Sequence, residues 1–281
     1  MPITLHARPP GIRQITDVEG AWLKEMYPGM PPTLAQCITC GGTKTFRWKA
    51  LDGHVVDYDC NCVDQRIMHR YFTVCGLGLR YQRLGWQDAT GVDDTVMAEA
   101  IDYVDHMGAY MRTGRGLILR GATTGTGKTL VAALLFKKML AEGHDGYFVQ
   151  FNRLLDMEAD GWGRGESAEE NRRWFTRRIR NAGVLVIDDI GREYAGRGME
   201  RIEATLDTII RARHDDCKPT IITTNKDGEF FSQRYQGNVM SLLLGTCQVI
   251  DVPGVTDHRD WAQEQADYDA KHGLVRPVVV G

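Results

Sequence analysis

The sequence of 281 residues predicts an α/β fold built on a five-stranded parallel sheet, and three observations support this prediction. From about residue 98 onward, five short and nearly all-apolar segments alternate with longer segments of helical periodicity. A glycine-rich loop, residues 121–129, lies between one of these segments and a helix, and another segment ends in two aspartates. Short apolar strands separated by helices are typical of a parallel sheet that is covered on both faces.

The chain begins with a leader, residues 1–33, which holds six of its nine prolines. Inside it, Thr16 and Glu19 have the spacing of a capping box and precede an apolar stripe that includes Trp22. This pattern predicts one short amphipathic helix that ends near Pro28. The helix either packs on its own protein or docks on a partner.

A compact cysteine module follows in residues 34–66. The dipeptide Asp52-Gly53 separates two alternating segments, which predicts a β-hairpin. Two cysteines precede this hairpin and two follow it, so the hairpin is expected to bring the two pairs together. Four thiolates that meet around a short hairpin are the layout of a tetrahedral zinc ribbon. A segment this short cannot bury a core of its own, so a metal would supply the missing stability. The predicted Zn²⁺ ligands are Cys37, Cys40, Cys60 and Cys62. The alternative is that the cysteines are small buried apolar residues.

The rest of the chain divides into three parts. Residues 67–100 are expected to form a helical linker, residues 101–262 the domain with the parallel sheet, and residues 263–281 a C-terminal tail. The expected strands are 116–120, 146–151, 184–188, 220–225 and 247–252. The expected helices are 98–112, 128–143, 168–181 and 199–213.

The loop GATTGTGKT, residues 121–129, departs slightly from the usual phosphate-binding pattern of Gly, four residues and Gly-Lys-Ser/Thr. Its first position holds Ala122, which is still small enough for the turn from strand to loop. Amides at the N-terminus of the next helix are expected to contact the β-phosphate, because the helix dipole favours anions there. Lys128 is expected to reach the β- and γ-phosphates, and Thr129 to ligate Mg²⁺. The predicted binding residues for ATP are Gly125, Thr126, Gly127, Lys128 and Thr129.

Two further strands are expected to complete this site. Sixty residues after Lys128, the apolar strand VLVI ends in Asp188 and Asp189. The ends of parallel strands meet at one edge of the sheet, beside the phosphate loop. We expect Asp188 to hold Mg²⁺ and Asp189 to polarise the attacking water, with the amide of Asn225 orienting the same water. These residues predict Mg²⁺-dependent hydrolysis of ATP.

The segments GLILRGATTGTGKTLVAALL, VLVIDDIGRE and PTIITTN together resemble the AAA+ P-loop ATPases of the DnaC/DnaI helicase-loader group, with the transposition ATPase IstB as a near relative. The resemblance covers roughly residues 101–260, and Asp-Asp-Ile-Gly-x-Glu is its most discriminating element. The cysteine module resembles, in its layout, the zinc-binding N-terminal domain of DnaI-type loaders.

The resemblance implies a loader that binds a hexameric replicative helicase of the DnaB type through its N-terminal domain. It implies a homo-oligomeric, ATP-dependent spiral that passes single-stranded DNA into the helicase ring during bacterial or bacteriophage replication. It also implies an AAA+ domain without the usual helical lid. Only about 30 residues follow the last expected strand, which agrees with the absence of a lid.

One departure from the group concerns an arginine that reaches the ATP of the neighbouring subunit. In such loaders it lies just before the last strand, and the corresponding stretch here is RYQGNVMSLLLG, with Leu242 at the expected position. Arg259, Arg234 and Arg213 are possible substitutes. Hydrolysis is therefore expected to be weak or differently triggered.

Two stretches combine aromatic and basic residues, which is how proteins hold single strands without reading their sequence. They are GWGRG, residues 161–165, and NRRWFTRRIR, residues 171–180. The predicted DNA-binding residues are Trp162, Arg164, Arg172 and Arg173. The alternative is a surface helix whose Phe175 and Ile179 pack inward.

Composition restricts the setting in which such a protein acts. The 34 Lys and Arg residues against 37 Asp and Glu give a net charge of −3, so any contact with nucleic acid must come from a local patch. No apolar run approaches the roughly 18–20 residues that span a bilayer, and the N-terminus lacks the order of a signal peptide. We therefore expect no membrane partner, a cytoplasmic location and reduced cysteines.

Two other functions fit the same motifs. One is an IstB-like transposition helper, which would act on a transposase. The other is an adaptor that contains zinc and a nucleotide-gated clamp and that hydrolyses little ATP.

Overall fold

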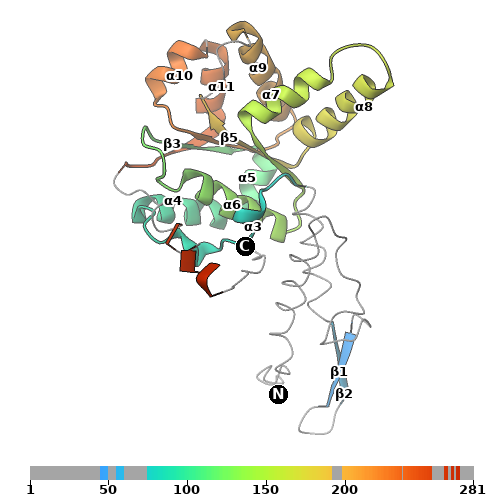
Figure 1. Ribbon diagram of the computed structural model, residues 1–281, viewed down its shortest axis with the longest axis vertical. Helices are drawn as coiled ribbons and strands as arrows, with labels where there is room; N and C mark the ends of the chain where they lie inside the picture. The colour runs from blue at the N-terminus through green and yellow to red at the C-terminus, as the bar shows by residue number, and fades with distance from the viewer. Residues whose placement is uncertain are drawn as a thin grey trace.

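The computed structural model describes residues 45–49, 55–59, 75–191, 198–235 and 237–254, together with residues 263–264, 267–268 and 270–272 (Figure 1). The leader, the four predicted zinc ligands and Arg259 lie outside these residues. The expectation that the domain has no lid also stays a prediction, because most of residues 255–281 lie outside them. Within the described residues, no helix is both long enough and apolar enough to cross a membrane.

A five-stranded sheet organises the main body of the protein, and every pair of neighbouring strands is parallel. The strand order is β4-β5-β6-β3-β7, so the phosphate-loop strand β3 lies between β6 and β7. The predicted parallel sheet is confirmed, and each observed strand coincides with an expected one. The strands are β3 (Gly116–Arg120), β4 (Gly146–Gln150), β5 (Val184–Ile190), β6 (Thr220–Thr224) and β7 (Cys247–Asp251).

Helices cover both faces of the sheet, and each face has its own apolar core (Figure 1). Alternation along β5 divides its side chains between the cores: Val184 and Val186 face one, Leu185 and Ile187 the other. The first face is covered by α3 (Leu79–Gln82), the 3₁₀ turn η4 (Trp86–Ala89), α4 (Asp94–Asp105), α5 (Met107–Thr113) and α6 (Lys128–Ala141). The second is covered by α7 (Phe151–Asp160), α8 (Glu166–Phe175), the π-helical turn η5 (Thr176–Arg180), α9 (Met199–Asp215), α10 (Gly228–Arg234) and α11 (Gly237–Thr246).

The helices differ from expectation in three places. The helix expected at 98–112 is two helices, because the chain leaves helical geometry at His106. Phe151 does not end β4 but begins α7, whose buried residues follow the i, i+3, i+4 spacing of an amphipathic helix. Helices α10 and α11 were not expected, since residues 226–246 were assigned to neither a helix nor a strand.

The described part of the expected linker packs directly on the sheet. Cys75 and Leu77 are buried in the first core with Val92 and Val96. The backbone N–H of Phe148 donates a 2.7 Å hydrogen bond to the carbonyl of Cys75, which ties this segment to the edge strand β4. Residues 75–100 therefore share the core of the body that contains the parallel sheet. Further toward the N-terminus, β1 (Thr45–Lys49) pairs with β2 (Val55–Asp59) in antiparallel register, which confirms the predicted hairpin.

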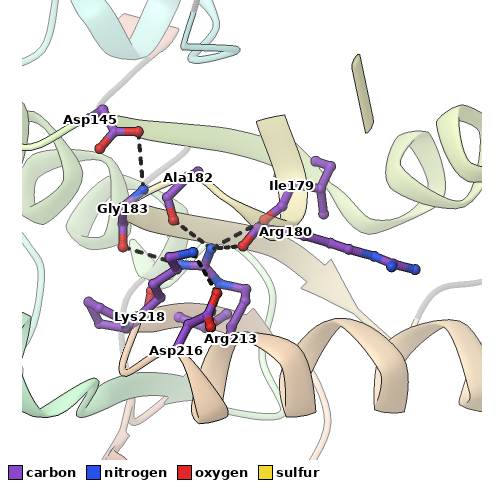
Figure 2. A network of polar contacts seen from close by, with 10 residues as sticks. Asp145, Ile179, Arg180, Ala182, Gly183, Arg213, Asp216 and Lys218 are labelled. Atoms are coloured by element: carbon purple, nitrogen blue, oxygen red, sulfur yellow. Dashed lines mark hydrogen bonds and ion pairs between the residues drawn. The ribbon is translucent and has the colours of Figure 1, made fainter. Parts of the chain in front are cut away.

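A fully buried arginine fixes the end of the sheet opposite the phosphate loop (Figure 2). Arg213, near the end of α9, donates six hydrogen bonds to the segments that lead into β5 and β6. The shortest, 2.6 Å and 2.7 Å, go to the carbonyls of Ala182 and Pro219. The carbonyl of Pro219 also accepts a 3.3 Å hydrogen bond from the backbone N–H of Leu185, and the guanidinium supplies further donors to the buried carbonyls that precede the two strands.

Burial also lowers the pKa of Arg213 to about 9, while the nearby carboxylates of Asp145 and Asp216 act in the opposite direction. The side chain is therefore still charged near neutral pH. A buried guanidinium that is engaged in this way cannot extend to a neighbouring subunit. The structure thus removes Arg213 from the arginines that could act across an interface.

Candidate nucleotide-binding site

The glycine-rich loop joins β3 to α6 and forms one side of a cavity of about 300 Å³. Gly125 and Gly127 have φ angles of 82° and 88°, a region that residues with a side chain rarely adopt. A Cβ atom on Gly127 would also lie 2.6 Å from Cγ2 of Val92. The loop therefore requires glycine at both positions. Both glycines are present, although the first position of the usual pattern holds Ala122 instead of glycine.

Lys128 places its ammonium group inside the loop. Its Nζ atom donates to the carbonyl of Thr123 across 2.6 Å and to the hydroxyl of Thr126 across 2.9 Å. The residue is buried, at 6% exposure, although it begins a helix beside an open cavity. The loop thus surrounds a fixed positive charge at the N-terminus of α6, an arrangement that suits the phosphates of a nucleotide.

Asp188 lies at the centre of a chain of hydroxyl groups. The hydroxyls of Thr129 and Thr223 donate to its Oδ1 atom across 2.9 Å and 2.6 Å. Burial raises the pKa of Asp188 above its usual value, the hydrogen bonds from Thr223 and Thr129 lower it, and the charge of Asp189 raises it further. A carboxylate beside a hydroxyl offers the hard oxygen ligands that Mg²⁺ prefers, so these residues fit the ion that the sequence predicts.

Asp189 shares the cavity because β5 is irregular at this point. Adjacent residues of a regular strand point to opposite faces, so Asp188 and Asp189 could not both line one cavity. The pairing of β5 with β6 shifts register between Ile187 and Ile190, and Asp189 has a left-handed φ of 61°. Irregularities of this kind redirect side chains near functional sites.

Two residues of β6 and the loop after it hold Asp189 in this position. Its backbone N–H donates to the hydroxyl of Thr223 across 2.9 Å, and the amide of Asn225 donates to its Oδ1 atom across 2.8 Å. The structure therefore brings together Lys128, Thr129, Asp188, Asp189 and Asn225 in one cavity. Thr223 was present in the quoted motif, but the sequence did not show that it joins the two aspartates.

The other side of the cavity comes from the segment that was expected to be a linker. Arg80, Tyr81 and Leu84 line it there, and Gln150 lines it from the end of β4. The aromatic ring of Tyr81 and the aliphatic side chain of Leu84 suit a base and sugar, whereas the guanidinium of Arg80 suits a phosphate. Sequence reasoning missed these residues because no local motif marks them.

A second buried lysine holds this wall against α6. Lys137 is fully buried, and its Nζ atom donates to the carbonyls of Leu84 and Gln82 across 2.6 Å and 3.2 Å. The Gln82 amide in turn donates to the carbonyl of Leu77 across 2.6 Å. The phosphate-loop helix and the wall of the cavity are thus joined by buried polar contacts.

None of the other predicted residues whose side chains are described lines this cavity. Arg234 ends α10, and its side chain is not among those described. Arg172 and Arg173 both pair with Glu169, and Arg172 also donates to the carbonyls of Gly161 and Gly163.

The turn between α7 and α8 carries the two other residues predicted to bind DNA. Trp162 is 47% exposed, its indole N–H donates to Glu158, and the guanidinium of Arg201 lies over its ring. Arg164 is exposed in the same turn. Phe175 and Ile179 are buried in the second core, as the structural alternative predicted.

The sequence also matches a family model described as IstB-like ATP binding protein, over residues 23–254. The chain belongs to this family. The predicted relationship to the IstB-like ATP-binding family is therefore confirmed. The comparison with curated proteins finds no match.

The fold is also similar to that of solved structures. A putative primosome component from Streptococcus pyogenes has a TM-score of 0.53 and 18% identity, over 68% of this chain and 98% of its own. The structure of DnaI has a TM-score of 0.51 and 19% identity, over 63% of this chain and 94% of its own. The DnaC helicase loader has a TM-score of 0.47 and 22% identity, over 65% of this chain and 98% of its own. At these identities the first two show a shared fold.

Proposed function

We propose that this IstB-like protein is a Mg²⁺-dependent ATPase that binds a hexameric replicative helicase of the DnaB type and delivers it onto single-stranded DNA. The observation that carries the ATPase part is the single cavity that contains Lys128, Thr129, Asp188, Asp189 and Asn225. Membership of the IstB-like family supports nucleotide binding, and the shared fold with DnaI supports the loader role.

Each of these residues has a distinct task in the proposed reaction. Lys128 and the amides of the loop bind the β- and γ-phosphates. Thr129 and Asp188 hold Mg²⁺, which supplies charge neutralisation on the phosphates when it is bound. Asp189, kept in place by Asn225, orients the attacking water and accepts its proton.

Nucleotide binding is tested with Lys128→Ala. The substitution removes the charge that balances the γ-phosphate, so the affinity for a fluorescent ATP analogue should collapse while the fold, followed by circular dichroism, persists. Unchanged affinity in the folded variant would contradict the assignment of the phosphate loop.

The N-terminal part of the chain is the proposed helicase-binding part, and it holds one Zn²⁺ on Cys37, Cys40, Cys60 and Cys62. The hairpin of β1 and β2 supports this proposal, because it ends just before Cys60. Elemental analysis of metal-replete protein is expected to give one zinc per chain. The variant Cys37→Ser/Cys40→Ser should lose the zinc and the helicase, yet keep ATP. Metal-free wild-type protein would refute the zinc site.

A second candidate function is that of a helper ATPase in transposition, and the description of the matching family favours it. The partner distinguishes the two. In the helicase-loader proposal, the protein comigrates with the purified hexameric helicase of its host in the presence of ATP and transfers it to circular single-stranded DNA. Comigration with a transposase instead would support the IstB-like helper. Binding to neither, with little hydrolysis, would favour the adaptor.

A further inference from the structure

A second cavity, of about 560 Å³, adjoins the nucleotide site at the edge strand β4. Tyr81, Gln150 and Asp188 line both cavities, so the two share walls. Its remaining walls come from the segment at Gly76 and Gly78, from β4, and from α7, α8 and η5. Its volume lies within the range of cavities that bury small ligands. The proposed hydrolysis of ATP uses none of the residues that are specific to this second cavity.

Two cations line this cavity without a carboxylate partner among the described residues. Arg153 comes from α7 and Arg178 from η5. Burial raises the pKa of Tyr147, which lies between α7 and η5 on β4, and the charges of Arg153 and Arg178 lower it. Both guanidinium groups therefore act on the same phenol at the wall of the cavity.

These two arginines differ from those that the sequence singled out. Arg172 and Arg173 are held by Glu169, with N–O distances of 2.8 Å and 3.0 Å, so much of their charge is already balanced. The side chain of Arg178, by contrast, is half-buried in a cavity large enough for a ligand. An anion that enters this cavity would meet two cations at once.

An exposed aromatic ring completes the wall. Trp174 is 41% exposed although it lies at the end of α8, and its ring meets that of Tyr147 edge to face at a centroid distance of 5.5 Å and an angle of 89°. The contact with buried Tyr147 fixes the indole while leaving part of it open. A fixed exposed ring beside two cations is the combination that binds a base and its phosphate.

We propose that this second cavity, with Arg153, Arg178 and Trp174 on its walls, binds a segment of single-stranded nucleic acid. The inference rests on the proposed loader function and assigns a binding site to the single-stranded DNA. It assigns the strand to side chains other than Trp162, Arg164, Arg172 and Arg173, the DNA-binding residues that the sequence predicted. Trp174 stacks on a base, and the two arginines contact the phosphates that flank it.

The shared walls imply that strand and nucleotide affect each other. Asp188 and Gln150 face both ligands, so a nucleotide that reorients either residue changes the second cavity. Coupling between two binding sites is reciprocal, so the strand must alter the affinity for ATP by the same factor as ATP alters the affinity for the strand.

The test measures the affinity of the full chain for a fluorescent oligothymidylate by anisotropy, with ATP and Mg²⁺, over a series of salt concentrations. Trp174→Ala should weaken binding roughly 5- to 150-fold, the range expected for loss of one stacked base, and Trp174→Phe should restore part of it. Arg178→Gln should reduce the slope of log affinity against log salt by about 0.7, the value for one phosphate contact on a single strand. Arg211→Gln, an exposed arginine of α9, is the matched control and should bind as the wild type does.

Affinity for a fluorescent ATP analogue is measured in the same preparations, which separates the two proposals. Wild-type protein that binds no nucleotide would refute the proposed function. Normal nucleotide binding with unaltered strand affinity in Trp174→Ala and Arg178→Gln would overturn the second site alone. Loss of single-strand binding only in Trp162→Ala or Arg173→Gln would overturn the inference and place the binding site at the turn between α7 and α8 and on α8 itself. Binding of free thymidine monophosphate as tightly as the oligonucleotide would show a small-molecule site and would also overturn the inference.

Discussion

The side-chain amide of Asn225 donates a 2.8 Å hydrogen bond to Oδ1 of Asp189, and this contact joins the ends of β6 and β5 across 36 residues of sequence. The bond fixes the direction in which the carboxylate points. Asp189 needs such support because its backbone is left-handed, with φ of 61°. In the proposed reaction, the amide keeps this carboxylate oriented toward the attacking water.

Asp189→Asn is expected to retain nucleotide affinity and to abolish turnover. The substitution keeps the shape of the side chain but removes the proton acceptor, and neither Lys128 nor Thr129 depends on it. Phosphate release should fall by at least about 10²-fold, a typical contribution of a positioned base. The affinity for a fluorescent ATP analogue is the control. Retained turnover in Asp189→Asn would show that another residue activates the water.

Much of the fold was predictable because its signals are local. A strand, a glycine loop and a helix follow one another around Lys128, and VLVIDD marks a buried strand that ends in acids. Each of these patterns depends on neighbours in sequence, so all five strands were found where the sequence placed them. Helix α7 carried a comparable signal, with Phe151, Leu154 and Leu155 on one face, but the assignment of Phe151 to β4 obscured it.

The geometry of the site was less predictable because it depends on contacts between distant segments. The register shift that lets both aspartates face the cavity arises from the pairing of β5 with β6. Tyr81 reaches the cavity only because residues 75–100 pack on the sheet. Likewise, five arginines within residues 171–180 predict a basic surface, but pairing with Glu169 decides which of them are balanced.

Lys137→Met is expected to weaken ATP binding although Lys137 does not line the cavity. Methionine keeps the length of the side chain but cannot donate to the carbonyls of Gln82 and Leu84, so the wall that carries Tyr81 should loosen. We expect the affinity for ATP to fall roughly tenfold, which corresponds to about 1.4 kcal/mol.

Inorganic triphosphate separates a role in positioning from a general loss of stability. It needs only the loop and Lys128, so its affinity should change little in Lys137→Met. Lys138→Met, which removes a lysine of α6 that pairs with Glu142 at the surface, is the matched control and should affect neither ligand. Equal losses for ATP and triphosphate would mean that Lys137 supports α6 as a whole rather than the wall.

Arg213→Met is expected to destabilise the fold by about 3 kcal/mol or more. The substitution removes the guanidinium donors from several buried carbonyls, including that of Ala182, and each unsatisfied group costs about 1–3 kcal/mol. Urea unfolding followed by circular dichroism measures the loss. Arg211→Met, two residues earlier and exposed in a pair with Asp207, should change the unfolding free energy by less than about 0.5 kcal/mol. Equal losses of unfolding free energy in the two variants would show that the buried hydrogen bonds of Arg213 do not stabilise the fold.

The last prediction concerns the arginine that acts between subunits in the proposed homo-oligomer. Leu242 occupies the position expected for this arginine, and leucine has no charge to supply. Its side chain is partly buried against the second core. With Arg213 buried, Arg259 and Arg234 are the remaining candidates, and Arg259 comes first because it follows the last strand.

Mixing two inactive variants tests Arg259 directly. In a mixture of Arg259→Ala and Lys128→Ala subunits, one type of interface combines an intact phosphate loop with an intact Arg259. A charge supplied by a neighbour contributes a rate factor of about 10³–10⁵ in related phosphoryl transfer, so this interface should restore measurable ATP hydrolysis. Full activity of Arg259→Ala alone, or a mixture as inactive as its parts, would exclude Arg259. The same experiment with Arg234→Ala would then distinguish a substitute arginine from an ATPase that turns over slowly without one.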